Sequence, residues 1–130
     1  MNIVLWVLQM LLAAAFAAHG WMLVSPPADL VELMNEQLGV GFRLFLGVAE
    51  LMAAVGLILP GLTRILPWVI SLTALCLMVV VGSATVLHFF RGETDSAVIT
   101  TLLFVLCGFV AYMRWRVKPI APRAIGTENA

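Results

Sequence analysis

Charge is scarce in this chain of 130 residues, because seven Lys and Arg and seven Asp and Glu make up only 11% of it. A soluble globular domain carries about a quarter charged residues, so the chain departs from that class. So few scattered bases build no basic face, which argues against nucleic-acid binding. The two cysteines lie in apolar runs and form no framework, which excludes a secreted disulfide scaffold.

The motifs of common catalytic classes are missing as well. The sequence has no Gly-rich phosphate loop, no nucleophile elbow, no paired-carboxylate motif and no Cys-x-x-Cys redox motif. No residues that would ligate haem or an iron–sulfur cluster are recognisable. The two histidines do not stand at the spacing of a metal-binding motif, so we predict no metal site. We expect no enzymatic activity from the chain alone, and any catalytic role would be that of an accessory subunit.

What the chain has in abundance is apolar sequence, with 63% hydrophobic residues and a mean hydropathy of +1.10. A helix needs roughly 20 apolar residues to cross the ~30 Å hydrocarbon core of a bilayer. Cutting the chain at its polar interruptions leaves four such segments, at about 3–24, 40–59, 65–90 and 97–113. The sequence therefore predicts an all-α fold, an integral membrane antiparallel four-helix bundle within residues 1–118, whose first partner is the lipid bilayer.

The two ends of the chain allow further expectations. Ala15-Phe16-Ala17 resembles the cleavage site of a secretory signal, but no Lys or Arg precedes the apolar run, which continues past this site. We expect an uncleaved first span. Residues 119–130 lack apolar periodicity and contain Pro119 and Pro122, so this segment is predicted to be a disordered tail.

The positions of the basic residues predict the orientation. With four spans, both termini and the turn after the second span lie on the same side. Five bases fall on that side and two on the other, so the positive-inside rule places both termini in the cytoplasm of a bacterium, with the spans in its cytoplasmic (inner) membrane. The five are Arg64, Arg114, Arg116, Lys118 and Arg123, and the two are Arg43 and Arg91.

The first outer loop has a helical pattern of its own. Ser25-Pro26-Pro27 ends the first span, and a proline is tolerated in the first turn of a new helix. Within 28–38, apolar residues recur at helical spacing and acids lie between them, which predicts a short amphipathic helix on the membrane surface. This helix is either an ordinary connector or a lid over the interior of the bundle. The apolar set is Leu30, Leu33, Met34 and Leu38.

Four ionisable side chains inside the spans are the candidate site: His19, Arg43, Glu50 and His88. A charge at mid-membrane costs about 2.5–3.5 kcal/mol on insertion scales, so each of them needs a partner or a purpose. At 1.5 Å per residue, Glu50 lies about 15 Å from the outer boundary, which is the midplane, and the other three lie nearer the outer surface.

Arg43 and Glu50 are seven residues apart and so project from one side of the second span. Small residues share this stripe, which predicts that it packs against neighbouring helices. They are Gly47, Ala54 and Gly61. The reverse side of the span is apolar and is predicted to face lipid, with Phe45, Val48, Met52, Val55 and Leu59.

Helical side chains lean toward the N-terminus of their own helix. His19 and Glu50 therefore converge, whereas Arg43 leans away from Glu50 and occupies the same layer as His88. We predict a His19–Glu50 hydrogen bond, with Arg43 and His88 at the mouth of a cavity. The pair is either a ligand and proton site or a polar contact that only holds the helices together, because a buried carboxyl can also be protonated and bonded to a backbone carbonyl. Cys76 and Cys107 are expected near mid-bilayer, where buried cysteine usually acts as a small hydrophobe.

Several short motifs recur together in a known order. The first span ends in Gly20-Trp21-Met22-Leu23 before Pro26-Pro27, and Arg43 precedes Glu50-Leu51 and Gly56-Leu57-Ile58-Leu59-Pro60. The third span ends in Ala84-Thr85-Val86-Leu87-His88 before Arg91-Gly92-Glu93. In these motifs the chain resembles the DoxX-like family of small four-span bacterial membrane proteins. That family often has a lysine where this chain has Met22, so no role of that base is carried over.

The resemblance implies two classes of function. The family takes its name from a thiosulfate:quinone oxidoreductase subunit, and relatives have been linked to redox partners or to membrane-protein assembly. The first expectation is therefore a redox- or respiration-linked accessory subunit that binds a quinone or another small hydrophobic ligand around Glu50 and works with a membrane or redox partner protein. The alternative is a non-enzymatic assembly, chaperone or lipid-binding module with a purely structural polar core.

Overall fold

The structure, a computed structural model, describes residues 1–124, and these residues are helical throughout, apart from turns and the segment after residue 117. The elements are α1 (Asn2–Val24), α2 (Val31–Leu38), α3 (Val40–Thr63), α4 (Val69–Phe90), α5 (Thr94–Tyr112) and a π-helical turn, η1 (Met113–Val117). Within this part of the chain, four helices are long and apolar enough to cross a membrane: α1, α3, α4, and α5 together with η1. The predicted all-α membrane bundle is confirmed.

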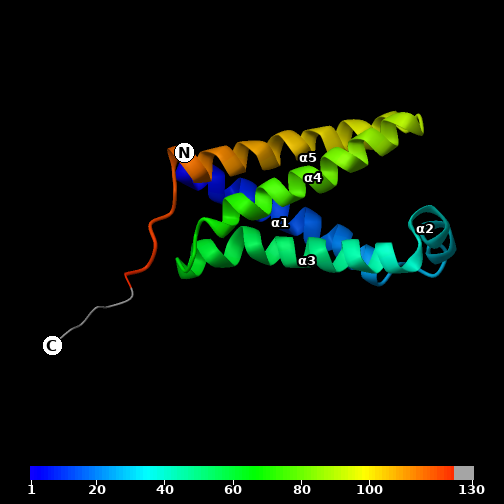
Figure 1. Cartoon of the computed structure of the whole chain (residues 1–130), viewed down its shortest axis with the longest axis horizontal. Helices are drawn as coiled ribbons and strands as arrows, with labels where there is room; N and C mark the ends of the chain where they lie inside the picture. The colour runs from blue at the N-terminus through cyan, green and yellow to red at the C-terminus, as the bar shows by residue number, and fades with distance from the viewer. Residues whose placement is uncertain (125–130) are drawn as a thin grey trace.

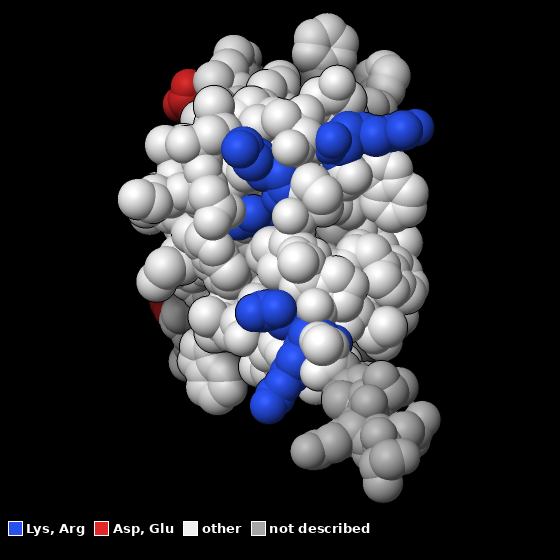
Figure 2. All heavy atoms as spheres, turned by 90° about the vertical axis from the view of Figure 1, so that its left-hand side faces the viewer, with Lys and Arg blue, Asp and Glu red and all other residues white. Residues whose placement is uncertain are grey.

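The helices form two antiparallel pairs, α1 with α3 and α4 with α5 (Figure 1). One end of the molecule, which we call the basic end, carries the N-terminus, the α3–α4 turn and η1. Lys and Arg side chains gather on this end, and acidic side chains are visible only at its margin (Figure 2). The opposite end, which we call the loop end, carries α2 and the α4–α5 turn. The chain thus alternates direction through the four spans, as a short-looped membrane bundle requires.

The core lies mainly toward the basic end and is formed by the inward stripes of all four spans. Its cluster includes Leu12, Leu57, Leu77 and Val110. Toward the loop end the two helix pairs separate (Figure 1), and no residue from 82 to 106 is buried. The inward stripe of α4 illustrates this change, because Val81 is buried whereas Thr85 and His88, one and two turns further on, are only half-buried.

The helix boundaries differ from the predicted spans at proline residues. The second span is predicted to end at Leu59, but α3 continues through Pro60 to Thr63, although Pro60 has no N–H to donate to the carbonyl of Gly56. We predicted that the third span begins at Ile65, but α4 begins at Val69, after a turn that contains Pro67. The fourth span is longer than predicted at both of its ends.

The predicted short helix of the first loop is present as α2, with Leu30 and Leu33 exposed and Glu32 in its first turn. A single residue, Gly39, joins α2 to α3. Its φ of 77° lies in the left-handed region that favours glycine, and this conformation lets the chain change direction sharply within one residue. The α2 helix thereby sits across the loop end of α3 (Figure 1).

The segment predicted to be a disordered tail is held in place in its first part. Residues 119–124 form no helix or strand, yet the Arg64 side chain donates to the carbonyl oxygens of Ala121 and Pro122, and the Arg123 N–H donates to the Arg64 carbonyl. Ile120 packs against the core. Residues 125–130, the rest of the predicted tail, lie outside the described residues.

Candidate functional site: a buried carboxyl paired with a half-exposed histidine

His19 of α1 and Glu50 of α3 meet between the two helices. The Nδ1 atom of His19 lies 2.6 Å from Oε2 of Glu50, which is a hydrogen-bond distance. The two side chains differ in burial, because the Glu50 side chain is 4% exposed and that of His19 is 51% exposed. A hydrogen bond between one ring nitrogen and a carboxylate sets the tautomer and the orientation of an imidazole. In His19 this leaves Nε2 available for a second partner.

Small residues bring α1 and α3 close together beside this pair. A Cβ atom added at Gly20 would lie 2.8 Å from the Gly47 carbonyl oxygen and 3.1 Å from the Cβ of Glu50. The two backbones are therefore in contact here, as in other membrane helix pairs with small interfacial residues. The three small residues of the predicted packing stripe, Gly47, Ala54 and Gly61, are all buried. The predicted lipid-facing residues of α3 are all exposed.

The exposure of His19 follows from the separation of the helix pairs. His19 lies on the same face of α1 as Leu12 and Phe16, both of which belong to the core. A residue on this face would be covered if α4 and α5 stayed in contact with α1 as far as the loop end. Because they diverge, the imidazole is presented on the inward side of the bundle, with the buried carboxyl of Glu50 behind it.

Arg43 is buried but does not reach Glu50 or His88. Its Nε donates to Oδ1 of Asn35 at 2.9 Å, and one of its terminal nitrogens donates to the carbonyl oxygen of Leu23. Arg43 therefore joins three elements, because Leu23 lies in the last turn of α1 and Asn35 lies in α2. A cation is favourable beside the C-terminal carbonyl groups of a helix. Among the described hydrogen bonds and ion pairs, Arg43 and His88 make no contact with one another.

His88 is bonded within its own helix pair. Its Nδ1 faces Oε2 of Glu93, five residues further along the chain, in the turn between α4 and α5. The residue was expected beside Arg43, but the divergence of the helix pairs at the loop end separates α4 from α3. The structure thus brings together two of the four candidate side chains, His19 and Glu50, and gives the other two local partners.

A second buried polar cluster lies at the basic end, and the sequence interpretation missed it. Arg114 was expected at the lipid surface, but it is 4% exposed, with Nε 2.6 Å from Oε1 of Gln9 and a terminal nitrogen 2.7 Å from Oδ1 of Asn2. Its guanidinium also lies 5.4 Å from the ring centroid of Trp6. Gln9 in turn donates to the carbonyl oxygen of Leu57 at 2.6 Å.

Helical periodicity places Arg114 on the inward side of the fourth span, at the start of the π-helical turn. In η1 the Lys118 N–H bonds to the Met113 carbonyl, five residues back, instead of the usual four. Arg114 continues the buried stripe of α5, seven residues after Cys107 and four after Val110, so it is buried whereas Trp115 and Arg116 are exposed. Gln9 is the sequence signal for this cluster, because a primary amide within an apolar span needs a hydrogen-bond partner, as an ionisable side chain does.

The cysteines and acids form no further site in the part of the chain that the structure describes. Cys76 is exposed and Cys107 is buried, so the two thiols occupy different surroundings and both are free. Among residues 1–124, no group of three or more His, Cys, Asp or Glu side chains is placed to hold a metal ion.

Four membrane-spanning helices with a buried polar contact between the first two define the class of the protein, a small multi-pass membrane protein. The family comparison agrees with this class, since the model of the DoxX-like family matches residues 7–110. The chain belongs to the DoxX-like family. No match was found among curated proteins or among solved structures.

Proposed function

We propose that the protein is an accessory subunit of a membrane redox system, which binds the head group of a quinone-like amphiphile at His19. One observation carries the proposal: a buried carboxyl, Glu50, holds one nitrogen of an imidazole that is itself half exposed. An apolar surround with a few convergent polar groups is the usual composition of a small-molecule site.

The chemistry of the pair suits a carbonyl head group. His19 Nε2–H donates a hydrogen bond to a quinone oxygen, and the carboxylate of Glu50 stabilises the imidazolium that precedes proton transfer. Conversion of a quinone to a quinol takes up two electrons and two protons. The pair handles protons only, so the electrons come from a redox partner protein, and this chain supplies binding, orientation and proton delivery.

The proposal includes the location of the protein. The bases at the basic end support an orientation in the bacterial cytoplasmic membrane with both termini in the cytoplasm. Burial of Arg114 removes one base from that surface, but Arg64, Arg116, Lys118 and Arg123 remain exposed. Reporter fusions at residue 130 and in the α4–α5 turn test the orientation, and an extracellular reporter signal from the C-terminal fusion would overturn it.

The test is native mass spectrometry of the gently extracted full chain, read for co-purified quinone. We expect His19→Gln and Glu50→Gln to reduce quinone retention at least tenfold while yield and helicity are preserved. Glu93→Gln is the matched control, because it removes the carboxylate of the other His–Glu contact, outside the proposed site. Equal quinone retention by the wild type and both site variants would overturn the proposal.

The alternative is an assembly, chaperone or lipid-binding module without a redox role. The tight approach of Gly20 and Gly47 beside Glu50 supports it, because a polar contact at a close helix crossing also determines helix register. Under this alternative, Glu50→Gln lowers yield and thermal stability, and no quinone is found even with the wild-type protein.

A further inference from the structure

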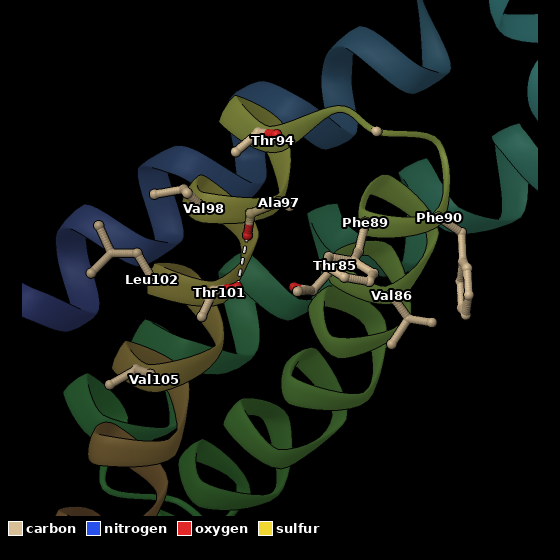
Figure 3. Close-up of a pocket in the computed structure, with 11 residues that line it drawn as sticks. Thr85, Val86, Phe89, Phe90, Thr94, Ala97, Val98, Thr101, Leu102 and Val105 are labelled. Carbon is tan, nitrogen blue, oxygen red and sulfur yellow. Dashed lines mark hydrogen bonds between the residues drawn. The ribbon is translucent and has the colours of Figure 1, made fainter.

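A wide apolar groove runs along the α4–α5 pair near the loop end, on the side away from the core. It has a volume of about 1010 Å³. Most of its lining comes from α5, where Val98, Leu102 and Val105 are more than half exposed, whereas Cys107 and Val110 on the opposite side of the helix are in the core. Figure 3 shows the lining side chains of the two helices, with the Thr101 hydroxyl donating a hydrogen bond to the Ala97 carbonyl oxygen.

A second, smaller cavity continues the groove at the α4–α5 turn. It has a volume of about 360 Å³ and is lined by residues 92–96, from Gly92 to Ser96. Gly92 and Thr94 line both cavities, so the two are adjacent. The larger is lined chiefly by aliphatic and aromatic side chains, and the smaller by carboxylate and hydroxyl groups. An apolar groove that ends in a polar cavity is complementary to an amphiphile, which has an apolar chain and a polar head group.

The length of the groove corresponds to one leaflet of a membrane. The helix α5 lines it from Thr94 to Val105, which at 1.5 Å per residue is about 16 Å. The hydrocarbon core is ~30 Å thick, so half of it is about 15 Å. The groove therefore starts at the membrane surface and ends near the midplane, which is the depth that the acyl chain of a lipid in that leaflet occupies.

The charges at the groove mouth have both signs. Asp95 lines the smaller cavity, and Arg91, which lines neither cavity, adjoins them in the sequence between the lining residues Phe90 and Gly92. Both side chains are exposed, and within residues 1–124 neither makes a hydrogen bond or an ion pair. The Glu93 carboxylate already forms a hydrogen bond with His88. An anionic head group would meet Arg91 and also the repulsion of Asp95, whereas a zwitterionic head group matches both.

We propose that this groove is a binding site for a zwitterionic phospholipid with a primary amine, of the phosphatidylethanolamine type. The acyl chain lies along Val98, Leu102 and Val105, the phosphate pairs with Arg91, and the ammonium donates hydrogen bonds to the carboxylate of Asp95. A quaternary ammonium has no N–H to donate, so the site discriminates between the two zwitterionic head groups. This site is separate from His19 and Glu50.

The experiment adds phosphatidylethanolamine, phosphatidylcholine or phosphatidylglycerol with identical acyl chains to the delipidated full chain, and counts bound lipids by native mass spectrometry. We expect phosphatidylethanolamine to be retained best. Asp95→Asn should reduce its advantage over phosphatidylcholine by about threefold, the size expected for an exposed ion pair. Arg91→Gln should weaken the binding of all three lipids.

Filling the groove tests the apolar part of the site. Ala97→Trp should reduce the retention of phosphatidylethanolamine, whereas Val55→Trp on the exposed side of α3 should not, and both variants should keep their helicity. Retention of phosphatidylglycerol equal to that of phosphatidylethanolamine would overturn the proposal, as would full lipid retention by Ala97→Trp. Quinone retention by Ala97→Trp should be unchanged, which separates this test from that of the proposed function.

Discussion

Arg114 and Gln9 are 105 positions apart in the sequence, and Nε of Arg114 lies 2.6 Å from Oε1 of Gln9 in the interior of the bundle. This contact joins the last turn of the fourth span to the first span. Because the other Gln9 hydrogen bond goes to the Leu57 carbonyl in α3, one amide connects three spans at the basic end. The helix pairs are thus linked where the core is tight and separate where His19 is exposed.

Replacement of Gln9 by leucine should destabilise the protein by about 2–3 kcal/mol, because it leaves a buried guanidinium without its amide acceptor. Reversible unfolding in mixed detergent micelles, followed by circular dichroism, measures the change. Ser83→Ala is the control, since the exposed Ser83 hydroxyl bonds only to the carbonyl four residues before it, and its loss should change stability by less than about 0.5 kcal/mol. Equal effects of the two substitutions would contradict the role of Gln9.

A methyl group at Gly20 should separate α1 from α3. Gly20→Ala places a Cβ 2.8 Å from a backbone oxygen, which cannot move aside as a flexible side chain can, so we expect a loss of about 1–3 kcal/mol. Gly41→Ala in the first turn of α3 is the matched control, because a Cβ there meets nothing within 4 Å. It should leave stability unchanged or raise it slightly, given the higher helix propensity of alanine. A harmless Gly20→Ala would show that the helices pack less closely than described.

Arg43→Met should release α2 from the bundle, because the substitution removes the hydrogen bonds to Asn35 and to the Leu23 carbonyl. We expect amide hydrogen exchange in Val31–Leu38 to accelerate by at least tenfold, with a smaller change in the spans. Glu36→Gln, an exposed substitution within α2 itself, should leave exchange as in the wild type. Unchanged protection of α2 in Arg43→Met would mean that other contacts hold this helix.

The two His–Glu pairs should differ in their contribution to stability. Glu93 is 42% exposed, and exposed pairs are typically worth 0–1 kcal/mol, so Glu93→Gln should shift the unfolding free energy by about 0.5 kcal/mol or less. Glu50→Ala, which leaves an unfilled space and an unpaired imidazole between α1 and α3, should cost about 2 kcal/mol or more. Both changes in unfolding free energy are measured by the same unfolding titration. A larger loss of stability for Glu93→Gln than for Glu50→Ala would contradict the greater contribution assigned to the His19–Glu50 pair.

The spans and the His19–Glu50 contact could be predicted because both depend on local rules. Apolar length defines each span, and depth with side-chain direction brings His19 and Glu50 to one level. The position of His88 could not be predicted in this way. Its depth matches that of Arg43, but its partner is decided by how far α4 diverges from α3, and that angle depends on packing along the whole helix.

Arg114 illustrates the same limit for the basic end. In the sequence it is one of three bases that follow an apolar run, a pattern typical of an exposed membrane flank. Its burial depends on the inward stripe that it shares with Cys107 and Val110 and on an amide more than a hundred positions away. The stripe can be followed in the sequence spacing, whereas the partner amide reaches Arg114 only through the packing of the first span.

The sequence by itself determined that the chain is a four-span helical membrane protein, because backbone groups in lipid have to be satisfied within each helix and only long apolar segments can provide this. It also determined which side chains are costly in the membrane. The tertiary structure alone decided which of them meet, since the crossing angles of the helix pairs bury Glu50 and Arg114, leave His19 half exposed, and keep His88 apart. Those angles depend on contacts between distant segments, such as Gly20 with Gly47 and Gln9 with Arg114.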